Sequence, residues 1–360
     1  MTEPQPFIFD VHLDLSMNAM EWNRDLTQPL EKIRICEANQ TDKPDRSMGT
    51  VCLPEMRKGN VGLCVATQIA RYTKQKNPLP GWHSPAQAWA QSQGQLSWYN
   101  EVERQGELTQ ICNLEQLESH LEKWSTGQNK QLPIGYVLSL EGADSIITLQ
   151  HLESAYEKGL RAIGPAHYGP GTYAPGTGES GPLGNGATEL LREMERLNII
   201  LDVTHLSDTS LDQALDTFSG TVWASHCNCR TLVPGERQLN DHQLKRLIER
   251  GGVIGAALDA WMLIPGWQRG LTTPQSSGVK LSHVANHIDY VCQLAGNSKH
   301  ACIGTDLDGG FGLEQSPGDM ESIADLQKLP SILGKRGYST DDINNVMGLN
   351  AIDILRSAWK

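Results

Sequence analysis

The sequence predicts an α/β fold, a closed (β/α)8 barrel of the TIM type. Eight short apolar runs recur along the chain, helix-period stretches lie between several of them, and no Gly-x-Gly-x-x-Gly follows any run. A parallel strand covered by helices on both faces reads as a continuous apolar run. The rival architecture, an open doubly wound sheet, usually carries that glycine fingerprint after its first strand. The expected strands are 7–15, 61–70, 134–140, 160–167, 199–205, 221–226, 252–258 and 301–307.

Four stretches repeat apolar residues at the spacing of an amphipathic helix, and we expect them to be barrel helices. They are residues 187–197, 241–249, 283–294 and 339–355. In the first stretch Leu190, Leu191 and Met194 share one face. Strands that alternate with such helices favour a parallel sheet with crossover connections, which is the pattern of the barrel.

Two stretches show no periodicity, and we expect them to be long loops of one barrel domain that covers residues 1–360. Residues 16–50 are polar, and residues 168–186 are rich in glycine and proline. A loop as long as 168–186 in a compact domain is usually functional or mobile.

The composition excludes several classes of protein. The chain has 360 residues, 39% of them hydrophobic, and a net charge of −12, which opposes binding to nucleic acid or to anionic membranes. The start of the chain lacks the basic and apolar segments of a signal peptide, and no apolar stretch is long enough to span a bilayer. The eight cysteines are dispersed. We therefore expect a cytoplasmic protein with reduced thiols.

Metal-capable side chains stand at the carboxyl ends of most of the apolar runs. They are His12, Asp14, Glu141, His167, His205, His226 and Asp306. In a barrel these strand ends converge on one face, where barrel enzymes hold their active sites. One histidine at a strand end is usually a hydrogen-bonded residue without a ligand. The repeated placement favours a metal site, since polar groups in a core need a partner.

The spacing around His12 and Glu141 suits a centre of two divalent cations. His12 and Asp14 are two residues apart, so on one strand they would point to the same face. Glu141 precedes Gly142, which leaves room for close approach. Together with His205 and His226, these residues supply nitrogen and oxygen ligands for two ions bridged by Glu141. Such ligands suit Zn²⁺, and Mn²⁺, Co²⁺ or Fe²⁺ are alternatives.

The ordered motifs resemble those of the membrane (renal) dipeptidase family from about residue 7 to 357. The matching segments are 9–15 (FDVHLDL), 139–142 (SLEG), 201–207 (LDVTHLS), 225–226 (SH), 303–309 (IGTDLDG) and 348–350 (GLN). Each motif alone is weak, whereas their order and spacing are specific. The resemblance implies a (β/α)8 barrel and a binuclear zinc dipeptidase. It is closest to a soluble microbial-type member, acting on small dipeptides with a free C-terminal carboxylate.

The resemblance also implies a role for each site residue. His12 and Asp14 would bind one zinc ion, His205 and His226 the other, and Glu141 would bridge the two. Asp306 would be the catalytic carboxylate, because Asp308 precedes two glycines and is expected in a turn. His167 would contact the substrate during catalysis, and Arg237 would hold its terminal carboxylate. The family allows a D-residue at the C-terminal position, and a homodimer is compatible with it.

Two observations keep alternatives open. The segment after His167 reads Tyr168-Gly169-Pro170-Gly171, which departs from the asparagine-containing family pattern. Arg237, in Pro234-Gly235-Glu236-Arg237, would be a surface arginine without the resemblance. The alternatives are another binuclear-metal barrel hydrolase, acting on lactones, phosphoesters or N-acyl amino acids, or a non-catalytic barrel that only binds a ligand. Many such hydrolases use a carboxylated lysine, and no lysine ends any of the eight runs.

Overall fold

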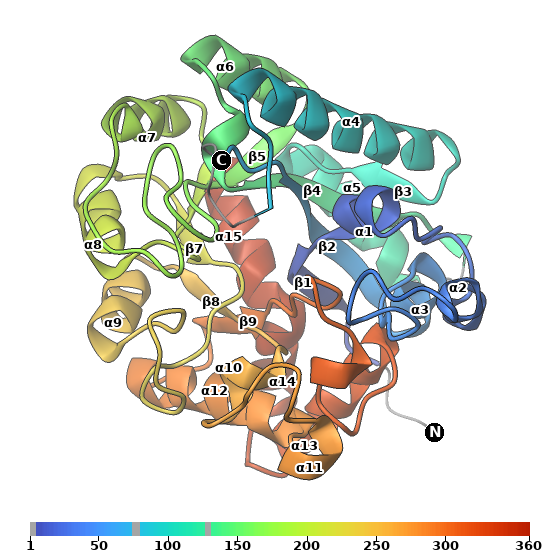
Figure 1. Ribbon diagram of the computed structural model, residues 1–360. Helices are drawn as coiled ribbons and strands as arrows, with labels where there is room; N and C mark the ends of the chain where they lie inside the picture. The colour runs from blue at the N-terminus through green and yellow to red at the C-terminus, as the bar shows by residue number, and fades with distance from the viewer. Residues whose placement is uncertain (1–4, 74–79, 127–130) are drawn as a thin grey trace.

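The computed structural model describes residues 5–73, 80–126 and 131–360. Within these ranges eight parallel strands close into a barrel with helices around it, as Figure 1 shows, so the predicted (β/α)8 fold is confirmed. The strands follow one another around the barrel in the order β1-β2-β4-β5-β6-β7-β8-β9. The barrel closes where Asp10 of β1 pairs with Ile303 of β9. The first four residues, on which the absence of a signal peptide partly rests, lie outside the described ranges.

Each predicted run contains one barrel strand, but most strands end before the polar residue that closes the run. The bounds are β1 Ile8–Leu13, β2 Val61–Ile69, β4 Ile134–Glu141, β5 Leu160–Gly164, β6 Ile200–Asp202, β7 Val222–Ala224, β8 Val253–Ala256 and β9 Ala301–Ile303. An additional short strand, β3 (Leu108–Gln110), pairs with the first half of β4, on the edge that β5 uses further along. The site histidines after β5, β6 and β7 therefore lie in loops.

The predicted helices are present, and residues 16–50 correct one expectation. The periodic stretches form α7 (Ala187–Arg196), α9 (Asp241–Glu249), α12 (Leu281–Ala295), and α14 (Thr340–Asn344) followed by a π-helical turn (Asn345–Leu349) and α15 (Asn350–Ala358). The stretch 16–50, expected to be irregular, contains most of α1 and all of α2. The remaining helices are α1 Leu15–Glu21, α2 Leu30–Glu37, α3 Leu53–Lys58, α4 Pro85–Arg104, α5 Leu114–Ser125, α6 Leu149–Glu157, α8 Asp208–Thr217, α10 Ala260–Leu263, α11 Pro274–Ser277 and α13 Leu329–Gly334.

The barrel interior and the helix α15 share one buried apolar cluster. Phe9, Val65 and Trp223 from the strands pack with Ile352 and Leu355 of α15. In Figure 1 α15 lies across the middle of the ring of strands. Burying side chains of this size stabilises the fold by about 1.5–3 kcal/mol each. The site residues follow the carboxyl ends of the strands, so α15 fills the barrel at its other end.

A second, larger apolar cluster fills the layer between the strands and the outer helices.

The eight cysteines are unpaired, and six of them are buried, whereas Cys36 is exposed and Cys112 is partly exposed. Across the described part of the chain, no helix combines the length and apolar character needed to span a bilayer.

Candidate metal centre and active site

His12 and Asp14 meet at the end of β1, although not in the way the sequence predicts. The strand ends at Leu13, and Asp14 is the residue that precedes α1, so the two do not share a strand face. The turn nevertheless brings Asp14 Oδ1 within 3.8 Å of His12 Nε2. The hydroxyl of Thr67 in β2 donates to the same carboxylate oxygen. Both side chains are buried and are held in place from two adjacent strands.

Glu141 lies at the centre of the cluster. Its Oε1 is 3.1 Å from His205 Nε2, 3.2 Å from His226 Nε2 and 3.6 Å from His12 Nε2. Glu141 is the last residue of β4, and Gly142 follows it with φ +79°. Glycine adopts this left-handed conformation without strain, which lets the chain turn sharply after the carboxylate. The glycine is needed for its backbone more than for space, since an added Cβ would make ordinary contact, 3.4 Å from His167.

Two other site residues have a left-handed backbone. His205 has φ 68° and Asp306 has φ 58°. Non-glycine residues seldom adopt this region, and histidine and aspartate are among those that do so most often. The turn after β9 places Asp306 Oδ1 at 3.7 Å from His12 Nε2. Such local strain is typical of functional sites that the surrounding fold holds in place.

Asp308, the alternative to Asp306, is held by contacts that stabilise the fold. It also has a left-handed backbone, with φ 61°, as expected for a turn residue. Its carboxylate is buried and accepts hydrogen bonds from the backbone N–H groups of Thr50 and Val51 and from the Thr50 hydroxyl. The Arg24 guanidinium lies 3.6 Å away. Asp308 therefore ties the turn to a neighbouring loop and does not face the cluster.

A cavity of about 190 Å³ opens beside the cluster. Asp14, Glu141, His167, His205, Arg237 and Asp306 line it, whereas His12 and His226 are almost fully buried behind it. Arg237 is buried and not at the surface. It donates to the carbonyl oxygen of His226 over 3.0 Å and contacts Cys227 Sγ at 3.4 Å. All eight residues predicted from the sequence thus gather in one place.

A second cavity of about 340 Å³ adjoins the first. The two share Asp14, His167, Gly309 and Gly310. The second cavity has walls that are largely apolar, from Met17, Trp22, Ile69, Pro80 and Trp82. Its charged residues besides Asp14 are Glu21, Lys43 and Arg71, and Arg71 hydrogen-bonds His167 Nδ1.

Burial and like charge dominate the electrostatics of the cluster. Burial, together with the Asp14 and Asp306 carboxylates, raises the pKa of Glu141 well above its usual range. Burial raises the pKa of Asp14 to about 6 and, with the Asp14 charge, that of Asp306 well above its usual value. Burial, with a smaller contribution from Arg237, lowers the pKa of His12 to about 3. The imidazoles are therefore neutral. The three carboxyl groups lie so close together that all of them can be ionised only if a cation lies among them.

The donor set fits divalent metal ions. Glu141, His205 and His226 form one group of mutually close ligand atoms, and His12, Asp14 and Asp306 form another. His12 Nε2 is buried and has no hydrogen-bond partner among the described residues, which is costly unless a ligand occupies it. Neutral imidazole and carboxylate are the ligands that zinc takes at hydrolytic sites.

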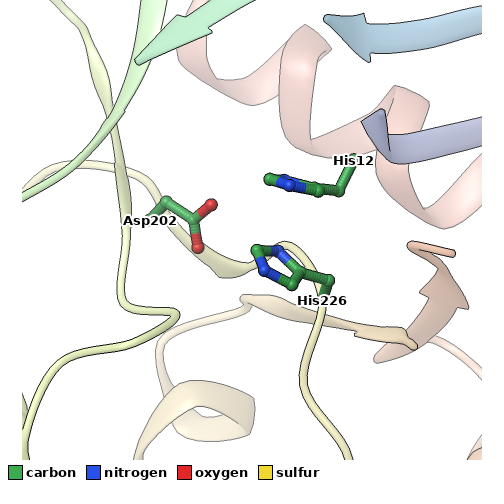
Figure 2. Close-up of side chains that lie close together, drawn as sticks. All are labelled: His12, Asp202 and His226. Carbon is green, nitrogen blue, oxygen red and sulfur yellow. The ribbon is translucent and has the colours of Figure 1, made fainter. Parts of the chain in front are cut away.

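A third group contains a residue that the sequence reasoning did not single out. Asp202, the last residue of β6, lies close to His12 and His226, and Figure 2 shows its carboxylate beside both rings. The carboxylate accepts the backbone N–H groups of Thr204 and Ser225. A carboxylate three residues before a predicted ligand, at the end of a buried strand, is the signal that could have identified Asp202.

The fold and this cluster define a (β/α)8 barrel with a candidate metal centre at the carboxyl ends of its strands. The family model described as membrane dipeptidase (peptidase family M19) matches residues 4–360, so the chain belongs to this family. The recognition made from the sequence motifs is thereby confirmed.

Two curated relatives illustrate the similarity of sequence. Dipeptidase tcpJ of Claviceps purpurea is 28% identical over 233 residues, which is 62% of this chain and 51% of that protein. A Klebsiella pneumoniae protein described as uncharacterized, from the pqqA 5′ region, is 27% identical over 58% of this chain and 76% of its own length. The chain thus spans only about half the length of the first of these relatives.

Solved structures share the fold. A dipeptidase described as a metallopeptidase of family M19 superposes with a TM-score of 0.79 at 21% identity, covering 99% of both chains. A metallopeptidase from Rhodobacter sphaeroides, solved with a phosphinate mimic of the dipeptide L-Ala-D-Ala, gives a TM-score of 0.76 at 19% identity, covering 99% of this chain and 100% of the other.

Proposed function

We propose that this protein is a metal-dependent dipeptidase that hydrolyses dipeptides with a free C-terminal carboxylate. The observation that carries the proposal is the position of Glu141 Oε1, within 3.6 Å of three imidazole nitrogens, in a cavity that also contains a buried arginine. Membership of the M19 family and the dipeptidase names of relatives support the same activity.

Two zinc ions are the proposed cofactors. His12 and Asp14 would hold one ion, His205 and His226 would hold the other, and the Glu141 carboxylate would be shared by both. When bound, the ions would supply a water molecule of lowered pKa and Lewis-acid polarisation of the substrate carbonyl. The crowded carboxylates and the unpartnered His12 Nε2 support this assignment.

Three side chains of the cavity would act on the substrate itself. The Arg237 guanidinium would bind the terminal carboxylate through two parallel hydrogen bonds, which favours substrates as short as a dipeptide. The His167 imidazole would donate from Nε2 to the carbonyl oxygen as negative charge develops there. Asp306 would accept the proton of the attacking water and pass it to the leaving amine.

The second cavity supports a preference for dipeptides with a large apolar N-terminal residue. A dipeptide whose carboxylate contacts Arg237 would extend past His167 toward the second cavity, because the two cavities share His167 and Asp14. The walls formed by Met17, Trp22 and Ile69 suit a large apolar side chain at the N-terminal residue. The Rhodobacter relative, solved with an L-Ala-D-Ala mimic, supports including D-residues at the C-terminal position.

The test is a hydrolysis screen of the zinc-loaded protein on a dipeptide library, with D- and L-residues at the C-terminal position. We expect metal-dependent cleavage of dipeptides, fastest with a large apolar N-terminal residue, and slower cleavage of the corresponding C-terminal amides. Lactones, a phosphotriester and N-acetyl amino acids form the comparison panel. Faster turnover of any of those classes would contradict the proposal, as would a protein that loads metal and cleaves nothing.

A further inference from the structure

The four imidazoles of the site are of two kinds, which differ in the group that contacts Nδ1. Nε2 of His12, His205 and His226 faces Glu141 Oε1, so Nδ1 of each ring points away from the proposed metal ions. A neutral imidazole carries its proton on one nitrogen and a lone pair on the other, and the hydrogen bond at one nitrogen decides which form is present. The groups around Nδ1 are therefore decisive for metal binding at Nε2.

One hydroxyl serves two of these rings. Ser225 Oγ lies 2.8 Å from His226 Nδ1 and 3.4 Å from His12 Nδ1. The two ring centroids are 3.6 Å apart with the ring planes inclined by 32°, and both Nδ1 atoms lie near the same hydroxyl. A serine hydroxyl has two lone pairs and one proton, so it can accept from both nitrogens only if its own proton goes elsewhere.

Thr204 provides an acceptor for that proton, because its Oγ1 lies 3.4 Å from Ser225 Oγ. The Asp202 carboxylate accepts the Ser225 backbone N–H over 3.0 Å and so holds this residue beside the rings. The Asp202 carboxylate also lies beside both imidazoles, as Figure 2 shows. A hydroxyl that donates to Thr204 Oγ1 has both of its lone pairs free to accept from the rings.

The backbone holds Ser225 in this position. Its carbonyl oxygen lies against Gly255 and Gly304, where a Cβ would approach to 1.9 and 1.7 Å. Any side chain at these two positions would displace Ser225. Gly255 of β8 and Gly304, which directly follows β9, thus fix the position of the Ser225 backbone.

His167 has the opposite arrangement. Its Nδ1 is hydrogen-bonded to the Arg71 guanidinium, which can only donate, so Nδ1 must carry the lone pair and Nε2 the proton. This form can donate from Nε2 to a substrate oxygen and cannot bind a metal there. The imidazole proposed as a substrate contact is therefore distinguished from the proposed ligands by its neighbour.

We propose that Ser225, held by Asp202 through its backbone N–H, is a positioning residue that holds the Nδ1–H forms of His12 and His226 and so presents both Nε2 lone pairs to the metal ions. A free histidine side chain favours the other form, so this arrangement needs a dedicated partner. The inference rests on the proposed function only in taking His12 and His226 as metal ligands. Partners of this kind typically change metal affinity by 10–100-fold.

The experiment measures zinc affinity by chelator competition in the absence of substrate. We expect Ser225→Ala to weaken binding about 10- to 100-fold and Asp202→Asn to weaken it in the same direction. Ser92→Ala removes a buried hydroxyl of α4 that donates to Trp89 O, outside the site, and should leave zinc affinity unchanged. Wild-type affinity in Ser225→Ala, with the fold intact by circular dichroism, would overturn the proposal.

A second measurement reads the ring forms directly. In the metal-free protein with ¹⁵N-labelled histidine, His12 and His226 should carry the proton on Nδ1 and His167 on Nε2. Ser225→Ala should convert His12 and His226 to mixtures and leave His167 unchanged. An Nε2–H form of His12 or His226 in the wild type would overturn the proposal, as would a third zinc ion at the Asp202 group. Because neither measurement uses a substrate, a missing dipeptidase activity would refute the proposed function alone.

Discussion

Oε1 of Glu141 lies 3.2 Å from Nε2 of His226, although the first residue ends β4 and the second follows β7. Without a cation, that contact leaves a buried carboxyl group whose pKa is raised by burial and by the neighbouring carboxylates. Shared metal ligation by Glu141 would resolve this cost, since an ion favours the charged form of the carboxylate.

Glu141→Gln should abolish tight metal binding and with it catalysis. The amide is a neutral and weaker ligand than the carboxylate, so we expect at most one zinc ion per chain after gel filtration, measured by elemental analysis. Glu249→Gln, on the exposed end of α9, is the matched control and should keep the wild-type metal content. Full metal content in Glu141→Gln would show that Glu141 is not shared between two ions.

Asp306→Asn should retain metal and lose turnover. Removing a general acid–base group lowers kcat by about 10²–10⁴-fold, whereas the proposed metal ligands are untouched. The measurement is kcat on a dipeptide together with zinc content. Loss of metal in this variant would instead make Asp306 a ligand, which its position near His12 and Asp14 permits.

Asp308→Asn should lower stability more than Asp306→Asn does. It weakens the buried contacts to Arg24 and Thr50, so we expect the free energy of unfolding to fall by about 2 kcal/mol, measured by urea denaturation. Asp306→Asn should cost less stability than this. Equal losses in the two variants would contradict the division between a catalytic and a structural aspartate.

Arg237→Met should remove discrimination between a dipeptide and its C-terminal amide. A charged hydrogen-bonded pair contributes about 1.5–3 kcal/mol, so kcat/KM on the free acid should fall by about 10- to 100-fold. The amide should be affected much less. If both substrates lose activity equally, Arg237 supports the fold of the loop and does not hold the carboxylate.

His287 should make the protein less stable in acid, independently of metal. Burial lowers its pKa to about 4, and its Nδ1 accepts the backbone N–H of Cys229. The unfolded chain binds a proton near pH 6.5 and the folded chain does not until about pH 4, so stability is lost as pH falls through this window. Between pH 7.5 and 5 the loss from this group is about 2 kcal/mol.

His287→Gln should remove that part of the pH dependence. The check is the free energy of unfolding of both proteins at the two pH values, with His242→Gln on the exposed side of α9 as the control. An identical pH slope in the wild type and His287→Gln would refute the prediction.

The barrel strands could be predicted because each is buried on both faces and reads as an apolar run. β3 escaped prediction because it is three residues long and only Leu108 is buried. The long helix α4 was not singled out either, since its buried face includes Ser92 and Gln95 among apolar residues. There the tertiary contacts of polar side chains replace the apolar periodicity that sequence reasoning follows.

The candidate metal ligands could be predicted from the sequence, whereas the residues that contact their outward-facing nitrogens could not. His12, Glu141 and His226 stand at the ends of runs, where chemistry and position coincide. Ser225 and Arg71 act on nitrogens that face away from the cavity centre, and their residue types are common on any surface. Only the coordinates show which nitrogen each of them meets.

The closure of the barrel sets the order in which the protein can be completed. β1 pairs with β9, and α15 fills the end of the barrel opposite the site. The strand that is synthesised first therefore cannot complete its contacts until β9 and α15 have been synthesised. Contacts so distant in sequence slow folding and leave unpaired strand edges exposed for a time. We expect a nascent chain halted before β9 to be a substrate for chaperones, because its sheet is still open and the chain still lacks Asp306.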